Sequence, residues 1–251
     1  MEPEDTSLIR DALHKAGLSI MPQCSATRIL ANEKGVKAVV LDNGKELPCQ
    51  MVCVGKGVVS NTDFLQNSGI HTDKGIITNA YAACNVKDTY AAGDVALSYD
   101  PGTGERISTA LWTHAVEMGI CAGLNMTGIQ SKYTGAFGIM NATQVASMPF
   151  VAIGQVHTKG QDAEIHIRKT DRTYKKLVFN KQGNKLIGAL FIGDINRAGL
   201  YRLIIRERKN IAKIKKEVIG HQVHYGHFLL NLKIAFAVLN FSNNINNSYK
   251  L

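Results

Sequence analysis

The 251-residue sequence lacks any uninterrupted apolar run of the roughly 18 residues that a membrane-spanning helix requires. Its first residues, Met1-Glu2-Pro3-Glu4-Asp5, are acidic and lack the apolar stretch of a secretory signal. Its five cysteines form no C-x-x-C pair. In an extended strand Cys49 and Cys53 would stand about 13 Å apart, too far for a disulfide. We therefore expect a protein of the reducing cytoplasm, without a membrane span.

The sequence also lacks a G-x-G-x-x-G fingerprint, the strand-to-helix turn that holds a dinucleotide pyrophosphate at a helix N-terminus. Two segments match it in part. Gly55-Lys56-Gly57 continues to Ser60, and Gly102-Thr103-Gly104 continues to Ile107 without a preceding apolar strand. These 251 residues therefore carry no complete pyrophosphate-binding motif.

Charge is distributed unevenly along a chain whose formal net charge is +9. Residues 168–251 hold 17 Lys and Arg against 4 Asp and Glu, whereas residues 1–167 hold 12 against 16. A basic second half can attract nucleic acid, an anionic surface or an acidic protein, or it can be a solvated lysine-rich surface. No ribonucleoprotein motif, zinc knuckle or helix-turn-helix pattern accompanies the charge, so we expect no nucleic-acid binding.

Hydrophobic periodicity and turn residues predict the elements of the first half. A helix is predicted over 4–16, with Gly17 as its C-cap. Strands follow over 18–21, 25–32 and 36–42. Asn43-Gly44 then predicts a two-residue hairpin turn, and the last strand of this part runs from Leu47 to Val54.

The next elements begin with a short helix capped by Asn61 or Thr62. A strand at 76–78 and an apolar strand ending at Gly93-Asp94 follow. The last is a helix from about 109–112 to Met126, and its apolar stripe is formed by Ala115, Met118, Ala122 and Met126.

The pattern changes after Tyr133. Apolar or alternating runs predict antiparallel strands at about 141–147, 150–155, 162–169, 173–180 and 185–192, followed by a helix at about 196–208, which together make an α+β domain. Beyond it, Ile211, Ile214 and Val218 share one helical face. The apolar segment 228–241 is too short to span a bilayer, and the Asn-rich segment 243–251 is expected to be disordered.

Three histidines, His221, His224 and His227, raise the possibility of an open zinc site. Steps of three residues turn each histidine about 60° from the last on a helix and place successive ones on opposite faces of a strand. We therefore expect a polar segment here and no metal site.

The stretch from Thr89 to Ala96 is the most informative, because an apolar run ends there in Gly93-Asp94. Such a run suits a buried parallel strand whose C-terminal end contacts a ligand. Gly93 would allow a ligand to approach the backbone, and Asp94 could accept hydrogen bonds from a sugar-like hydroxyl. The alternative is a strand followed by a turn that Asp94 initiates. For Trp112, the alternative to a ligand contact is packing in the core.

Four segments together resemble the second half of the FAD-dependent pyridine nucleotide–disulfide oxidoreductase family: 52–61, 90–95, 112–119 and 174–178. The branch they resemble is that of the NADH:rubredoxin reductases and nitrite reductase flavoproteins. The resemblance runs from about Leu8 to about Tyr225, with Ser60 where the family usually has proline and Cys84 where it commonly has threonine. It implies an α/β fold in which partial Rossmann-like FAD/NAD(P)-binding domains precede an α+β C-terminal interface domain.

The resemblance also implies a division of the chain. Residues 1–57 would be a remnant of the NAD(P)-binding domain, 58–128 the C-terminal segment of the FAD-binding domain, 129–208 the interface domain, and 209–251 a basic helix and disordered tail. The family carries both of its glycine fingerprints in its front half. The chain would then be a fragment, a truncated gene product or a split-enzyme subunit, inactive alone.

The implied cofactors are FAD and NAD(P)H. Gly93, Asp94 and Val95 would hold the ribityl chain, and the backbone N–H near Trp112 would face the flavin O2. A helix N-terminus there stabilises the negative charge that hydride transfer places on the N1–C2=O edge. Gly57 would pass close to the nicotinamide. No general acid or base can be named, so the catalytic residues are left unassigned.

Two functions stay open. The chain could be the C-terminal portion of a FAD-dependent NAD(P)H oxidoreductase that passes electrons from nicotinamide through flavin to an acceptor. It could instead be a non-enzymatic remnant or interaction module without a working cofactor site. The partners implied are the missing N-terminal half or a split subunit, a second copy bound through the C-terminal domain, and an acidic electron-carrier protein. An adjacent reading frame carrying both fingerprints would favour the enzyme.

Overall fold

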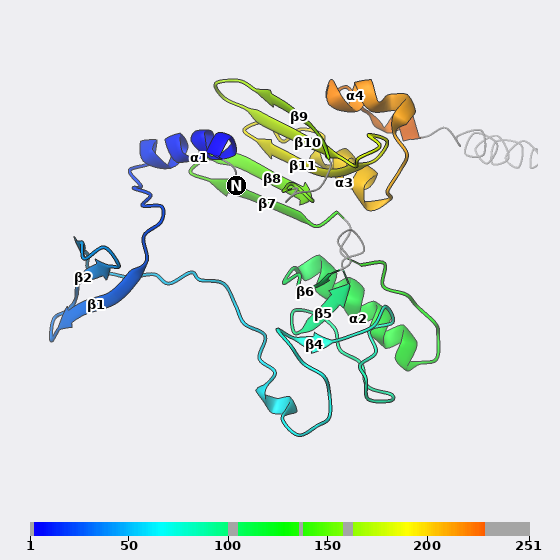
Figure 1. The fold of residues 1–251 in the computed structure, drawn as a ribbon, viewed down its shortest axis with the longest axis horizontal. Coiled ribbons are helices and arrows are strands. Elements are labelled where there is room, and N and C mark those ends of the chain that lie inside the picture. The colour runs from blue at the N-terminus through cyan, green and yellow to red at the C-terminus, as the bar shows by residue number, and fades with distance from the viewer. Residues whose placement is uncertain (1–2, 100–104, 136–137, 158–162, 229–251) are drawn as a thin grey trace, which may run out of the picture. The chain divides into compact units, whose positions relative to one another are not determined.

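The computed structural model describes residues 3–99, 105–135, 138–157 and 163–228, which form two compact units (Figure 1). We call Arg10–Tyr99 with Arg106–Tyr133 the central unit. Met1–Ile9, Asp100–Glu105 and Thr134–Leu251 make the C-terminal unit. Each is described by itself.

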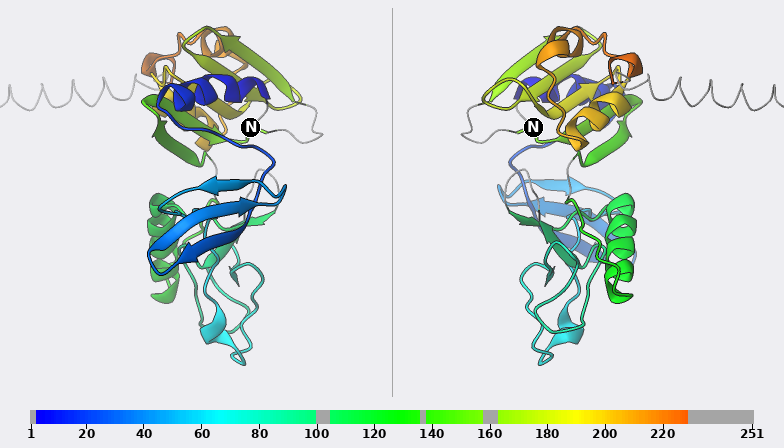
Figure 2. Two further views of the ribbon diagram at one scale, coloured as in Figure 1. Left: turned by 90° about the vertical axis from the view of Figure 1, so that its left-hand side faces the viewer. Right: turned by 90° about the vertical axis from the view of Figure 1, so that its right-hand side faces the viewer.

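The C-terminal unit is built on an antiparallel sheet of five strands in the order β7-β8-β11-β10-β9. The strands are β7 (Met140–Val145), β8 (Met148–Gly154), β9 (Glu164–Lys169), β10 (Tyr174–Phe179) and β11 (Leu186–Ile192). The strand β10, between β11 and the edge strand β9, is buried on both faces, with Tyr174 and Val178 on one and Leu177 and Phe179 on the other. Figure 2 shows the start of α1 (Pro3–Lys15) across one face and α3 (Ala198–Arg206) with α4 (Lys215–Ile219) across the other.

The core of this unit lies between the sheet and α3. Phe191, Tyr201 and Ile204 are fully buried, and the rings of Phe191 and Tyr201 meet edge-on with centroids 4.9 Å apart. The five predicted strands and the predicted helix are confirmed, and the helix buries one face because its apolar residues recur every three or four positions. The three predicted apolar residues Ile211, Ile214 and Val218 also pack on this core. They do not share one helix, because Ile211 precedes the 3-10 turn η2 (Ala212–Ile214), Ile214 ends it and Val218 lies in α4.

His221 fixes the turn after α4 to this core. Its ring stacks on Tyr201 with centroids 5.2 Å apart, and its Nδ1 lies 2.8 Å from the Tyr201 hydroxyl. Its Nε2 lies 3.0 Å from the carbonyl oxygen of Asn196. The other two histidines of the series contact each other instead, with ring centroids 3.9 Å apart. Among the residues that the structure describes, no three His, Cys, Asp or Glu side chains gather as a metal site.

The first part of the central unit is a three-stranded antiparallel meander of β1 (Ala26–Asn32), β2 (Gly35–Leu41) and β3 (Glu46–Pro48). The helix α1 that precedes it and the glycine cap are confirmed, since Gly17 follows α1 with φ of 80°. The predicted hairpin turn forms with a different length. Leu41 N donates to Lys45 O at 2.9 Å and only Gly44 has positive φ, so the connection has three residues.

The second part of the central unit packs a small sheet against one helix. The strand β4 (Ile76–Ile77) runs parallel to β5 (Ala96–Tyr99), which pairs antiparallel with β6 (Arg106–Ile107). Helix α2 (Trp112–Met126) covers this sheet through Met118, which is 2% exposed and packs with Ile76 and Ala96. The short helix predicted near Asn61 is the 3-10 turn η1 (Asp63–Leu65), where Asn61 Oδ1 accepts from Asp63 N at 3.3 Å.

Three strand predictions are wrong in place or extent. Residues 18–21 form no strand and are exposed. The strand predicted from Leu47 to Val54 ends at Pro48. Cys49 N still donates to Lys37 O at 2.9 Å, but beyond it the exposed Met51 and Val54 pair with no described strand. The strand placed before Gly93-Asp94 begins after it, at Ala96, and the apolar run upstream makes only one isolated bridge, between Tyr90 and Ala83.

The predicted stripe of α2 is also corrected. Met126 is 67% exposed, whereas His114 and Cys121, which were not expected in the core, are buried. The segments 229–241 and 243–251 lie outside the described residues. None of the helices in the described ranges is long and apolar enough to cross a membrane.

The environment of His221 predicts a pH-dependent stability. Burial, and then the charge of Lys175, lower the pKa of His221 below its ordinary value of 6.5. The unfolded chain therefore binds this proton more readily, so His221 favours folding above that value and the effect is lost as pH falls below it. The slope is at most about 1.4 kcal/mol per pH unit. In urea unfolding between about pH 7.5 and about pH 5.5, the free energy of unfolding of His221→Gln should fall less steeply with decreasing pH than that of the wild type. The exposed control His224→Gln should keep the wild-type slope, and equal slopes in all three proteins would contradict this account.

Candidate cofactor site

The Gly93-Asp94-Val95 turn packs against the first turn of α2. Ala96 N donates to Gly93 O at 3.0 Å, which closes the turn into β5. Gly93 has φ of 83°, in the left-handed region that disfavours a side chain, and a Cβ there would lie 3.7 Å from Ala115 Cβ. The backbone at Gly93 and the start of α2 are therefore neighbours, although Ala115 follows Gly93 by 22 positions in the sequence.

Asp94 is held through its main chain. The hydroxyls of Ser60 and Ser108 each donate to the Asp94 carbonyl oxygen at 3.1 Å. Asp94 itself is exposed, and its carboxylate makes no hydrogen bond or ion pair with any described residue. Two hydroxyls, one from a residue before Asp94 in the sequence and one from a residue after it, thus hold the Asp94 backbone. The carboxylate stays available for a ligand.

Helix α2 begins without a cap of its own. Its N-cap residue, Leu111, has an apolar side chain, and the first turn of the helix contains no acidic residue. The positive end of the helix dipole is therefore not compensated by side chains from the same turn. Trp112, its first residue, is 86% exposed, so the alternative of core packing for this side chain is not what the structure shows.

The five residues singled out from the sequence are only partly brought together. Gly93 and Asp94 lie beside the start of α2, and Val95 packs, half-buried, on the core around Ile76 and Met118. Gly57 is different. It has φ of 82° in a segment without regular structure, and an added Cβ would meet no atom within 4 Å. Gly57 is connected to the Gly93-Asp94-Val95 turn only through Ser60, three residues later in the chain, whose hydroxyl donates to the Asp94 carbonyl oxygen.

Sequence reasoning missed a buried polar pair under α2. His114 is 3% exposed, and its Nδ1 lies 2.7 Å from the Tyr133 hydroxyl. Tyr133 N donates to Ala80 O at 2.8 Å, which ties the end of the central unit to the turn after β4. It also missed Ser60 and Ser108 as supports for Asp94. For Ser60 a signal was present, since a hydroxyl in a position usually held by proline can donate a hydrogen bond.

Together these features can bind a polar, partly anionic ligand. The exposed carboxylate of Asp94 can accept from hydroxyl groups, and the uncapped N–H groups of α2 can donate to an oxygen that gains negative charge. Gly93 keeps the backbone between them free of a side chain. The Asp94 carboxylate has no hydrogen-bonded side-chain partner among the described residues, so the chemistry would belong to the bound group.

Residues 1–119 match the family model described as pyridine nucleotide-disulphide oxidoreductase. The pyridine nucleotide-disulfide oxidoreductase domain-containing protein 1 of Drosophila melanogaster is 31% identical over 165 residues, which are 61% of this chain and 34% of the relative. The NADH-rubredoxin oxidoreductase of Clostridium acetobutylicum is 26% identical over 184 residues, covering 72% of this chain and 46% of the relative.

Among solved structures, the ferredoxin reductase for the CYP199A2 system from Rhodopseudomonas palustris superimposes with a TM-score of 0.72 and 26% identity, over 84% of this chain and 51% of that one. Residues 1–119 thus resemble the pyridine nucleotide-disulphide oxidoreductase family, and so do the relatives that match longer stretches of the chain. The resemblance and the fold class expected from the sequence are thus confirmed. The chain spans about a third to a half of the length of these relatives.

Two glycines give opposite predictions that test the Gly93 turn. Gly93→Ala should destabilise the central unit by about 1–2 kcal/mol, because the left-handed backbone strains an alanine while the space is sufficient. Gly119→Ala, inside α2 with nothing within 4 Å of the added Cβ, should stabilise by up to about 1 kcal/mol. Urea unfolding followed by circular dichroism measures both. A neutral Gly93→Ala would show that the turn does not require a left-handed residue.

Proposed function

We propose that the chain is the C-terminal portion of a FAD-dependent NAD(P)H oxidoreductase that passes electrons from nicotinamide through flavin to an acceptor. The observation that carries the proposal is the packing of the Gly93 turn on the first turn of α2. It puts an exposed carboxylate and an uncapped helix N-terminus at one place. The resemblance to the pyridine nucleotide-disulphide oxidoreductases supplies the cofactor class.

The residues present suit a flavin. Bound flavin would supply hydride acceptance and electron transfer. The N–H groups at the start of α2 would donate to the O2 edge of the ring, where the helix dipole stabilises negative charge. The Asp94 carboxylate would accept from ribityl hydroxyls, and Gly93 and Val95 would pass beside the ribityl chain without a blocking side chain.

Ser60 and Ser108 act as positioning residues in this proposal. Each donates to the Asp94 carbonyl oxygen, so the main chain cannot turn the carboxylate away without breaking two hydrogen bonds. Ser60 also sets the path of the segment that contains Gly57, which we propose to lie near the nicotinamide. In the same proposal residues 1–57 belong to the NAD(P)-binding domain, 58–128 to the FAD-binding domain and 129–208 to an interface domain.

We further propose that a segment or subunit outside these 251 residues supplies the pyrophosphate site. The sequence carries no G-x-G-x-x-G fingerprint, and the Asp94 turn with one helix end offers only part of a dinucleotide contact surface. For the acceptor we propose a small acidic electron carrier. Two relatives are named for rubredoxin and ferredoxin, and residues 168–251 of this chain hold 17 basic against 4 acidic residues.

The chain alone should therefore bind FAD weakly or not at all, and it should not oxidise NADH. The purified chain is mixed with excess FAD, desalted and examined for flavin absorbance, and NADH consumption is followed in parallel. A stoichiometric yellow protein that turns over NADH would show that the pyrophosphate site is already present within these residues.

Asp94 is the residue whose replacement tests the site itself. In an assembly that contains the fingerprint-bearing half, Asp94→Ala removes a charge-assisted hydrogen bond of about 1.5–3 kcal/mol. It should therefore weaken FAD affinity by roughly one to two powers of ten, at about 1.4 kcal/mol per tenfold. Asp94→Asn should be milder because its amide oxygen still accepts. Flavin fluorescence titration measures the affinity.

A matched control is Asp73→Ala, which removes the same charge from another exposed position of the central unit and should leave FAD affinity unchanged. If Asp94 only forms a turn, Asp94→Ala will lower the melting temperature while the folded fraction binds FAD as tightly as the wild type. That outcome would remove the main support for the flavin site.

A further inference from the structure

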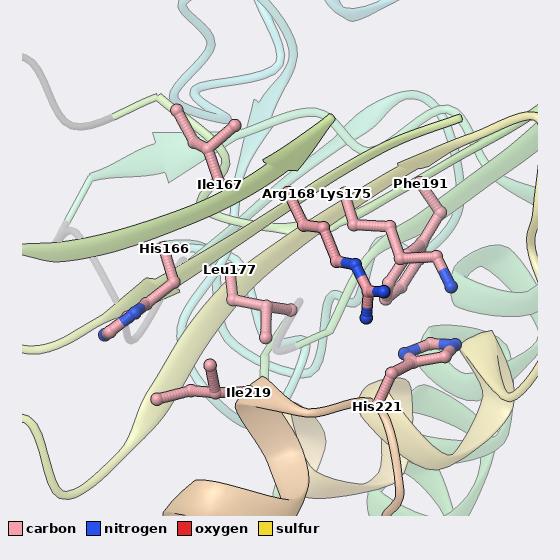
Figure 3. Close-up of a pocket in the computed structure, with 8 residues that line it drawn as sticks. All are labelled: His166, Ile167, Arg168, Lys175, Leu177, Phe191, Ile219 and His221. Carbon is pink, nitrogen blue, oxygen red and sulfur yellow. The ribbon is translucent and has the colours of Figure 1, made fainter. Parts of the chain in front are cut away.

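The C-terminal unit contains a cavity at the β9 edge of its sheet, and no residue of the proposed flavin site lines it. Its volume is about 270 Å³, and it opens between β9, β10 and β11 on one side and the end of α4 on the other (Figure 3). The residues that matter to the argument are Arg168, Lys175, Leu177, Phe191, Ile219 and His221. Neither the family resemblance nor the proposed electron transfer assigns a role to this cavity.

Two cations stand opposite each other at this cavity. Arg168 in β9 and Lys175 in β10 are direct partners in the antiparallel register. Like charges in that position repel and weaken a sheet. Lys175 is compensated, since its Nζ lies 2.6 Å from Asp194 Oδ2. For Arg168 the structure gives no ion pair or hydrogen bond with any described residue, so its guanidinium is the free charge.

His221 is the third polar side chain that lines the cavity, and its ring is held in place by hydrogen bonds. Both ring nitrogens are occupied, one by the Tyr201 hydroxyl at 2.8 Å and the other by the Asn196 carbonyl at 3.0 Å. Burial, and then the charge of Lys175, lower the pKa of His221, which favours the neutral ring at neutral pH. His221 therefore shapes the cavity, while Arg168 and Lys175 supply its positive charge.

The floor of the cavity is apolar. Leu177 is 5% exposed and Phe191 is fully buried, and both belong to the core of the unit. Ile219, at the end of α4, closes the side opposite β9 and is half-buried. Figure 3 shows Arg168 extending over this floor toward Lys175 and His221. A ligand that fits must therefore combine a negative group with a small apolar body.

We propose that this cavity binds a small carboxylate with an apolar or aromatic body, its carboxylate between Arg168 and Lys175 and its body on Leu177, Phe191 and Ile219. The volume of about 270 Å³ lies just under the range of drug-sized ligand sites, so the ligand is smaller than a nucleotide. A bidentate guanidinium–carboxylate pair matches the planar Arg168 head group.

A carboxylate suits this site better than a phosphate. The Asp194 carboxylate already lies 2.6 Å from Lys175, so a dianion would meet a negative charge on the far side of that lysine. A single negative charge, in contrast, relieves the repulsion between Arg168 and Lys175 without meeting an uncompensated anion. Relief of the repulsion between Arg168 and Lys175 would then contribute to the free energy of binding.

The test is a titration of the full chain with benzoate, followed by methyl and amide NMR. We expect saturable shifts confined to Leu177, Ile219 and their neighbours. Arg168→Gln should weaken benzoate binding about tenfold or more, because it removes a charge-assisted pair. The matched control is Arg172→Gln, which removes the same charge from the exposed turn between β9 and β10 and should bind benzoate like the wild type.

Three probes sharpen the outcome. Benzylamine, which has the same ring with a positive charge, should not bind. Acetate should bind more weakly than benzoate, because it leaves the apolar floor uncovered. Phenyl phosphate should bind no better than benzoate. The proposal is overturned if benzoate gives no saturable shifts, if Arg168→Gln and Arg172→Gln behave alike while both keep the wild-type spectrum elsewhere, or if phenyl phosphate binds more tightly.

Discussion

The left-handed backbone at Gly93 is the constraint on which the central unit's functional surface depends. A residue with φ of 83° lets the chain turn sharply into β5 while its backbone lies against Ala115 of α2. The turn presents the Asp94 carboxylate outward, and the two serine hydroxyls hold its carbonyl inward. A ligand group that needs both an acceptor and a helix N-terminus can find them together because no side chain stands at Gly93.

Elements formed by local patterns were predictable from the sequence, and elements that need a distant partner were not. The five strands of the C-terminal unit and the helices α1, α2 and α3 follow from periodicity and turn residues. The apolar run after Pro48 has the composition of a buried strand, yet Met51, Val54 and Val59 are 76%, 76% and 93% exposed. Apolar residues indicate that a segment can be buried, but a strand forms only where a second strand offers hydrogen bonds.

The same distinction holds for the two candidate sites. Gly93, Asp94 and Trp112 could be selected from one short stretch each, because a positive φ, a carboxylate and a helix start leave local signals. Ser60 and Ser108 contact Asp94 across 34 and 14 residues, and Arg168 faces Lys175 only through the register of β9 on β10. Such contacts depend on how segments are paired, which composition and spacing do not specify.

The charge count of the basic half overstates its free positive charge, because acidic partners occupy several of its cations. Lys175 pairs with Asp194 and Lys215 with Glu164, each at 2.6 Å. These contacts lower the pKa of both carboxyl groups below their ordinary values, which favours the charged form of each pair. A uniform basic surface would bind any polyanion through long-range attraction that salt screens. Here the free guanidinium of Arg168 lies over an apolar floor. Anion binding would therefore depend on this one residue and on whether the ligand has an apolar body that fits the floor.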